Sequence, residues 1–122
     1  MVVLGEGMPG LSHPDKAKIA LPAVLDALSD PTRLAIVAQL AESAEPEARC
    51  QSFLALGSKT NLAYHFAKLR TSGVVSVRQQ GTARYLSLRR KDLDTRFPGL
   101  LDSILAAARP PTRAAARRRD RA

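Results

Sequence analysis

The stretch GSKTNLAYHFAKLRTSGVVSVRQQGTARYLSL, residues 57–88, predicts a helix, a glycine stop and two short strands around a polar turn. Apolar side chains recur at the spacing of one helical face over 58–72, and Ser58 can accept hydrogen bonds from the first-turn amides. Gly73 stands where a helix closes with a left-handed residue. The polar face carries small or flat hydrogen-bonding groups and cations, which suits entry into a DNA groove: Lys59, Thr60, Asn61, Tyr64 and Lys68.

After the glycine stop the apolar period falls to two, as in a half-buried strand. Alternation over 75–78 and 85–88 predicts two strands, joined by a polar turn built on Gly81. Arg78 and Arg84 flank that turn. Two basic arms directly after a groove-entering helix are typical of a β-hairpin wing that follows a DNA backbone or enters a minor groove. The alternative is an exposed hairpin whose arginines only maintain solubility.

Charge is distributed unevenly along the chain of 122 residues, which carries a formal net charge of +8. No Asp or Glu occurs over 48–91, and all eleven acids lie in the flanks. A segment with many basic residues and no acidic residue is more typical of a phosphate-binding surface than of an ordinary solvent-exposed surface. Nine cations occupy this segment: Arg49, Lys59, Lys68, Arg70, Arg78, Arg84, Arg89, Arg90 and Lys91.

Three further helices are predicted upstream of the groove-entering helix. The first covers 15–28, interrupted at Pro22, and the second covers 31–42 behind the capping run Ser-Asp-Pro. The third covers 48–56 and ends in a glycine turn, so that it and the next helix form a helix-turn-helix pattern. Arg33 lies near a helix start, against the helix dipole, which indicates a salt bridge or a contact with a DNA phosphate.

A last helix is predicted over 98–108, after a basic run at 89–92 that leads to a short turn. Its leucine-rich face matches that of the first helix, and a domain of this size has a limited core of its own. A homodimer built from these two helices is the economical interpretation, and it would place two groove-entering helices on a pseudo-palindrome. The predicted dimerisation residues are Leu21, Val24, Leu25, Leu100, Leu101, Ile104 and Leu105.

The predicted fold class is mainly α: a winged helix-turn-helix of about five helices with a two-stranded β-hairpin wing. Residues 15–108 are expected to form this DNA-binding and dimerisation domain. Residues 1–14 are expected to be a flexible leader, and 109–122 a disordered Arg-rich tail. The tail would either add sequence-independent affinity for phosphates or serve only solubility.

Several function classes are disfavoured by what the sequence lacks. No Gly-rich phosphate loop and no nucleophile–base arrangement occurs, so the chain is not predicted to be an enzyme. The single cysteine, Cys50, rules out an intramolecular disulfide. No apolar run approaches the roughly 18 residues of a membrane span, and the N-terminal run lacks a signal peptide's basic region. A cytoplasmic, nucleoid-associated protein without a membrane partner is therefore expected.

Two runs carry a resemblance to a known family: ALSDPTRLAIVAQL at 27–40 and YHFAKLRTSGVV at 64–75. With the spacing of Arg78 and Gly81 in the wing, they resemble the ArsR/SmtB family of bacterial winged helix-turn-helix repressors. The likeness covers about residues 21–106. It implies a dimeric transcriptional repressor that a ligand, often a metal, releases from its operator.

This resemblance also implies roles for individual residues. Thr60, Asn61 and Tyr64 would face the bases, and Asn61 can contact adenine through two hydrogen bonds. Lys59 and Lys68 would hold phosphates. The complete predicted DNA-binding set is Ser58, Lys59, Thr60, Asn61, Tyr64, His65, Lys68, Arg78, Gly81 and Arg84.

The metal sites of the family are not matched by this sequence. The third-helix site needs a pair of thiolates, and only Cys50 is present; the last helix has Asp102 but no histidine. The two histidines are His13, expected to be exposed in the leader, and His65, which either touches DNA or packs between helices. No metal and no cofactor is therefore predicted. Cys50 is either a small buried hydrophobe or a redox-sensitive thiol whose pKa Arg49 lowers.

The leading hypothesis is a sequence-specific DNA-binding transcriptional regulator. It would be a homodimeric repressor that reads an inverted repeat in double-stranded DNA with helix 58–72 and wing 75–88. The alternatives are a non-specific basic nucleic-acid-binding protein, a winged-helix module for protein contacts, and a redox-responsive repressor that uses Cys50.

Overall fold

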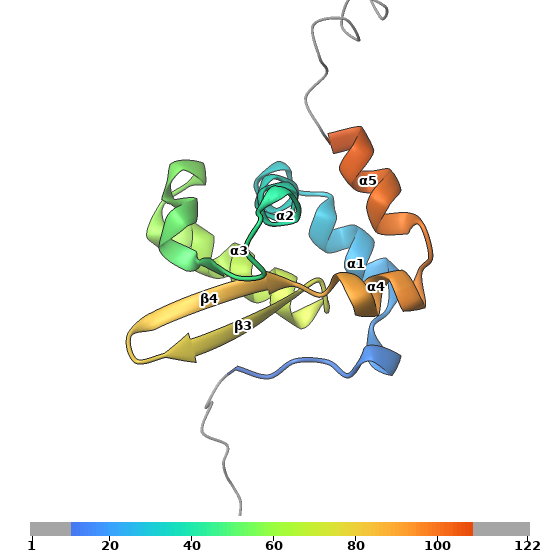
Figure 1. The fold of residues 1–122 in the computed structure, drawn as a ribbon, viewed down its shortest axis with the longest axis horizontal. Helices are drawn as coiled ribbons and strands as arrows, with labels where there is room; N and C mark the ends of the chain where they lie inside the picture. Colours follow the sequence, from blue (N-terminus) through green and yellow to red (C-terminus); the bar gives the residue numbers. More distant parts are fainter. Residues whose placement is uncertain (1–10, 109–122) are drawn as a thin grey trace, which may run out of the picture.

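The computed structural model describes residues 11–108, and helices surround the base of one long β-hairpin (Figure 1). The elements follow in the order η1 (Lys16–Lys18), α1 (Leu21–Leu28), α2 (Pro31–Glu42), β2 (Ala48–Arg49), η2 (Cys50–Leu56), α3 (Lys59–Thr71), β3 (Val75–Gln80), β4 (Ala83–Leu88), α4 (Arg90–Arg96) and α5 (Leu100–Ala108). The winged helix-turn-helix prediction is confirmed. The predicted tail at 109–122 lies outside the described residues.

Helix α3 has the boundaries that its sequence predicts, and both ends are capped. The Ser58 side chain accepts a hydrogen bond from the Asn61 amide at 3.2 Å. At the other end Gly73 adopts a φ of 89°, and its amide donates to the Arg70 carbonyl at 3.1 Å. The Val74 amide then donates to the Leu69 carbonyl at 3.0 Å, which completes a Schellman closure. The chain therefore leaves α3 in a fixed direction and enters β3 directly.

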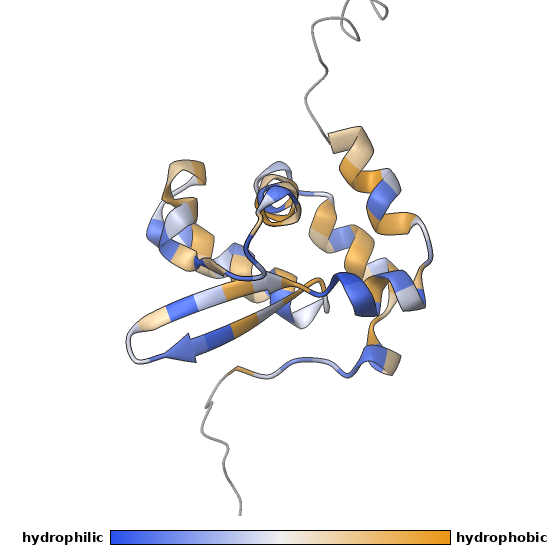
Figure 2. Ribbon diagram, viewed as in Figure 1, coloured by the Kyte–Doolittle hydropathy of each residue, from blue (hydrophilic) through white to orange (hydrophobic). Residues whose placement is uncertain are grey.

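The hairpin pairs β3 with β4 in an antiparallel register that runs from Val75 opposite Leu88 to Gln80 opposite Ala83. The apolar residues lie at the end nearest the helices, and hydrophilic residues occupy the outer half (Figure 2). The predicted two-stranded wing is present, and a third strand, β2, which the sequence did not predict, pairs with β4 on its other edge. The free edge of β4 offers unpaired backbone groups, and the two residues of β2 satisfy part of it.

Three of the predicted helices differ from those observed. The segment 15–28 contains only the 3-10 turn η1 and then α1, because Ile19 is drawn out of helical geometry and buried between them. The segment 48–56 begins as a strand and continues as the 3-10 helix η2. Where a short turn was expected after 89–92, the chain instead forms α4, and the last helix is shortened to α5.

The core is built from aliphatic side chains around one aromatic pair. Phe53 of η2 is fully buried, and its ring meets that of Phe66 of α3 edge-on at a centroid distance of 5.8 Å. Ile36 and Val37 of α2 and Leu86 of β4 are buried beside them in the same cluster. The recognition-type helix, the preceding η2 and the base of the wing therefore share one hydrophobic core.

The leader predicted over 1–14 is partly ordered against this core. His13 is exposed as predicted, and its Nε2 accepts a hydrogen bond from the Val77 amide of β3 at 3.0 Å. Arg70 donates to the Ser12 carbonyl at 2.6 Å, and Arg89 donates to the Pro14 carbonyl at 2.8 Å. Burial, with Arg70 and Arg89 nearby, lowers the pKa of His13, so the ring is kept neutral and able to accept.

Replacing Gly73 with alanine should destabilise the fold by roughly 2–4 kcal/mol, because a left-handed residue and an overpacked contact add their costs. A Cβ at this position would lie 2.6 Å from Ile19 Cγ1, and φ is +89°. Gly81→Ala is the matched control, since its φ is +62° and no atom lies within 4 Å of the added Cβ. Urea unfolding of both variants measures the difference. Equal losses in the two variants would contradict the packing argument.

Candidate nucleic-acid interface

The N-terminal half of α3 presents a mainly polar surface. Its first-turn residues are exposed, and the Tyr64 side chain is exposed one turn later. The Ser58 hydroxyl oxygen accepts the hydrogen bond that caps the helix. The following three side chains have no hydrogen-bond partner among residues 11–108. These side chains are Lys59, Thr60 and Asn61. The helix therefore offers a cation, a hydroxyl and an amide in one turn, which is the set that reads base edges and phosphates.

Arg33 of α2 links α2 to α1 and α3. It is 7% exposed, and its Nε donates to the Ala27 carbonyl at the end of α1 at 2.7 Å. Its Nη1 lies 3.1 Å from His65 Nδ1 on α3. A guanidinium only donates, so Nδ1 accepts and the proton of a neutral imidazole is on Nε2. The predicted salt bridge is not present among residues 11–108, because the Arg33 side chain contacts backbone carbonyls and a histidine. The predicted phosphate contact stays a prediction.

His65 lies on the inner side of the predicted DNA surface. Its side chain is 14% exposed, and Nδ1 is 3.9 Å from Asp30 Oδ2 as well as 3.1 Å from Arg33. Asp30 also caps α2 by accepting from the Arg33 amide at 3.0 Å, which lowers the pKa of that carboxyl. Of the two predicted roles for His65, packing between helices is the one that the geometry supports. Lys68, one turn further along, reaches Asp26 of α1 at 3.6 Å.

The wing arginines differ in their surroundings. Arg78 donates to both carboxylate oxygens of Glu47, at 2.9 and 2.8 Å, and stacks over the Tyr85 ring at 4.5 Å. The same hydrogen bonds lower the pKa of Glu47. Arg84 is exposed and has no ion-pair partner in the part of the chain that is described. Gly81 stands at the wing tip with a φ of 62°.

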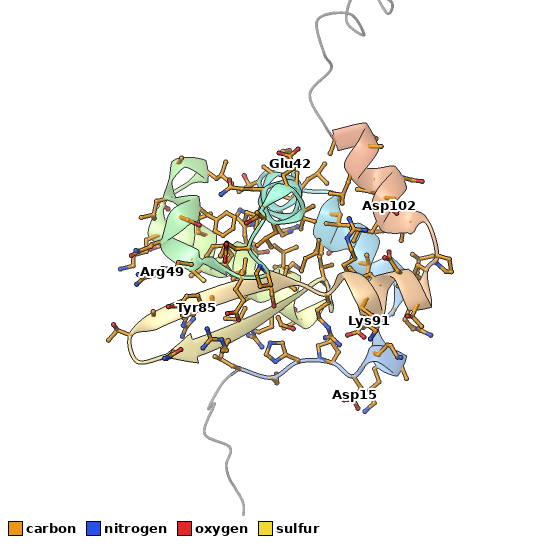
Figure 3. The ribbon with its side chains drawn as sticks, viewed as in Figure 1. Asp15, Glu42, Arg49, Tyr85, Lys91 and Asp102 are labelled. Carbon is orange, nitrogen blue, oxygen red and sulfur yellow. The ribbon has the colours of Figure 1, made fainter. Side chains whose placement is uncertain are left out.

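Glu47 is a residue that sequence reasoning missed. It is the last acid before the acid-free segment, and the pattern alone does not reveal its partner. The pairing of β2 with β4 places Arg49 opposite Tyr85, and that of β3 with β4 places Arg78 opposite the same tyrosine. A row of Arg49, Tyr85 and Arg78 thus crosses the sheet, and Glu47 pairs with Arg78. Figure 3 shows Arg49 and Tyr85 of this row. The Glu47–Arg78 pair could be predicted only if strand β2 had been predicted first.

The predicted dimerisation residues fall into two groups. Val24, Leu101 and Leu105 are buried in the protomer's own core. Leu21 and Leu25 of α1 are 40% and 46% exposed, and Leu100 and Ile104 of α5 are half-buried. Exposed leucines on a small monomer are costly in water, so the second group is the part that a partner could cover.

Cys50 lacks the features of a reactive thiol. Burial raises its pKa to about 11, and the nearby Arg84 only partly opposes this effect. The expectation that Arg49 lowers this pKa is therefore wrong. Among residues 11–108 no three His, Cys, Asp or Glu side chains gather in a way that could hold a metal ion. None of the helices described is long and apolar enough to cross a membrane.

Alkylation of Cys50 should therefore be slow at neutral pH. With a pKa of about 11, the thiolate fraction at pH 8 is roughly one hundredth of that of an unperturbed thiol. The rate with iodoacetamide should rise about tenfold per pH unit up to pH 10 and reach the rate of a model thiol after unfolding in urea. Mass spectrometry of the intact chain gives the rate. Rapid modification at pH 7 would restore the redox hypothesis.

Comparison with known proteins agrees with this geometry. No protein-family model matches the chain. Over 86 residues, 66% of this chain and 82% of the relative, it is 35% identical to the "Uncharacterized HTH-type transcriptional regulator YceK" of Bacillus subtilis (strain 168). Its fold is similar to that of a solved structure named "Crystal structure of ArsR family transcriptional regulator, RHA00566". That similarity has a TM-score of 0.56 at 20% identity and covers 74% of this chain and 98% of the other. The chain belongs to the helix-turn-helix transcriptional regulators, with the fold of their ArsR-type members.

Proposed function

We propose that the chain is a homodimeric repressor that reads an inverted-repeat operator with α3 and the β3–β4 wing. The observation that carries this proposal is the contrast along α3. Its C-terminal half is held by Leu69 in the core and by the Schellman closure, whereas the side chains that its N-terminal half exposes are mainly polar and include Tyr64. A rigidly held helix with an unengaged polar end is suited to insertion into a major groove.

Within the groove, the exposed first turn and Tyr64 would provide the base readout. Asn61 can hydrogen-bond the two major-groove groups of adenine, and Thr60 can contact either a base or a thymine methyl group. Lys59 at the helix start would neutralise a phosphate. Lys68 lies at the opposite end beside Asp26, so it would contribute less than its position in the sequence predicts.

The wing would provide phosphate contacts rather than base readout. Arg84 and the tip around Gly81 are free to approach a DNA backbone. Arg78 would act mainly by stiffening the wing, because its guanidinium is held by Glu47 and by the Tyr85 ring. The acid-free composition of the segment keeps repulsion between protein carboxylates and phosphates low.

Dimerisation would follow from the leucines that the protomer leaves uncovered. Leu21 and Leu25 of α1, with Leu100 and Ile104 of α5, would form the interface. Two copies of α3 roughly 34–36 Å apart would then meet successive major grooves on one side of the duplex. Repression follows if that operator overlaps a promoter.

Replacing Asn61 or Tyr64 with alanine should reduce operator affinity by roughly 10- to 100-fold each, because base-edge contacts are worth about 1–3 kcal/mol. Fluorescence anisotropy with DNA from upstream of the gene, compared with a scrambled duplex, measures the effect. Lys91→Ala on the exposed surface of α4 is the control and should change affinity little. Equal affinity of the unaltered chain for both duplexes would favour a non-specific basic binder instead.

Replacing Leu25 with glutamate should convert the dimer to a monomer and weaken operator binding, because a carboxylate cannot be buried in an apolar interface without a partner. Ala23→Glu adds the same charge to the opposite flank of α1, about 200° of helical rotation away, and should leave the dimer intact. Sedimentation equilibrium distinguishes the two variants. An unchanged mass for Leu25→Glu would place the interface elsewhere.

A further inference from the structure

A cavity of about 470 Å³ lies between η2, α3 and the turn of the wing. It is large enough for a small organic molecule, since ligand sites commonly have volumes of roughly 300–1,000 Å³. Its position beside the exposed end of α3 places it within the surface proposed to meet DNA.

The apolar part of the cavity lining, here called its floor, comes from η2, α3 and β3. Leu54 of η2 lines it and is 50% exposed, the highest exposure of any leucine in the described chain. Leu62 and Phe66 of α3 and Val77 of β3 add further apolar surface from the edge of the core. Apolar surface in a concave site favours a ligand with an apolar body over a bare inorganic ion.

The cationic part of the cavity lining, here called its rim, comes from four basic side chains. Arg49, Lys59, Arg70 and Arg84 all line it, and none of the described residues that line it is acidic. None of the four has an ion-pair partner among residues 11–108, in contrast to Arg78, Arg89 and Arg90, which all pair with carboxylates. Figure 3 shows Arg49 beside the hairpin, at the opposite end of the view from Lys91. Four cations around one cavity create a positive electrostatic potential that favours the binding of an anion.

We propose that this cavity binds an organic anion with a flat apolar body, of the aromatic carboxylate or sulfonate class, and that its occupation excludes operator DNA. The apolar body would lie on Leu54, and the anionic group would meet the cations of the rim. The second half of the inference rests on the proposed function, because Lys59 and Arg84 are also expected to hold phosphates. Two anions that need the same cations oppose each other's binding by equal free energies.

The site is tested on the full chain with 8-anilinonaphthalene-1-sulfonate, a fluorescent member of this class. Saturable binding of one molecule per chain is expected. Lys59→Glu and Leu54→Ser should each weaken binding by roughly tenfold, through like-charge repulsion and loss of apolar contact respectively. Lys91→Glu makes the same charge reversal at an exposed lysine outside the cavity and should have little effect. Equal losses in Lys59→Glu and Lys91→Glu would overturn the site.

Cys50 provides an independent readout, because it lines the cavity and is the sole cysteine of the chain. Saturation with the probe should slow alkylation of Cys50 several-fold at pH 9 without changing the rate in urea. An unchanged rate in the folded chain would contradict binding at this place. Benzoate should displace the probe more effectively than phosphate at equal ionic strength. Equal displacement by the two would contradict the role of the apolar floor.

Competition between the probe and operator DNA tests the second part of the proposal, that an occupied cavity excludes DNA. The probe should release operator from the unaltered chain and fail to release it from Leu54→Ser, which retains the DNA-contacting residues. Probe binding without release would overturn the exclusion while the site stands. Failure of the unaltered chain to prefer operator over scrambled DNA would overturn the proposed function, and the fluorescence and alkylation results would still decide the site.

Discussion

The closure of α3 at Gly73 is the constraint on which the rest of the structure depends. The left-handed glycine turns the chain so that the next residue begins the approach to β3, and Ile19 packs where a side chain at this position would have to lie. Because Ile19 belongs to the extended link before α1, one contact ties together the N-terminal part of the domain, the groove-entering helix and the wing. The relative orientation of helix and wing is therefore set by packing and not by a flexible joint, which is what recognition of two adjacent features of a duplex requires.

The cations of the acid-free segment then divide according to their partners. Arg89 and Arg90 pair with carboxylates of α4 and α5, and Arg78 pairs with Glu47, so these residues serve the fold. Arg49, Lys59 and Arg84 have no such partner within residues 11–108, and they gather near the exposed end of α3 and the wing. Exposed ion pairs contribute little to stability on their own. Here the ion pairs neutralise some of the cations, so the remaining positive charge is concentrated at one face of the protein.

The local features of α3 and the hairpin were predictable, whereas contacts between distant segments were not. Ser58 and Gly73 specify the ends of α3 through backbone chemistry that is contained within a few residues, and the period of two specifies the strands. Strand β2 was missed because two residues carry no periodicity, and η2 was predicted as an α-helix because apolar spacing does not distinguish it from a 3-10 helix over one or two turns. Arg33 and Glu47 find partners 32 and 31 residues away, at His65 and Arg78, and no local pattern encodes such pairs. Val24 and Leu101 were predicted at a dimer interface but lie in the protomer core. Amphipathic spacing predicts that a helix face is buried, but it does not predict whether the same chain or a partner covers that face.

A shared set of cations has a thermodynamic consequence for regulation. A ligand that binds only the DNA-free state shifts the equilibrium by RT ln(1 + [L]/Kd), so release depends on ligand concentration and needs no second conformation. The loss of phosphate contacts also acts steeply, because each neutralised phosphate contributes to a salt-dependent binding constant. The rigid junction at Gly73 and the core shared by η2, α3 and the wing leave little room for a helix to move on ligand binding. The proposed direct competition at the cationic rim would therefore need no movement of a helix, in contrast to a metal site that acts at a distance through a change between two packed arrangements.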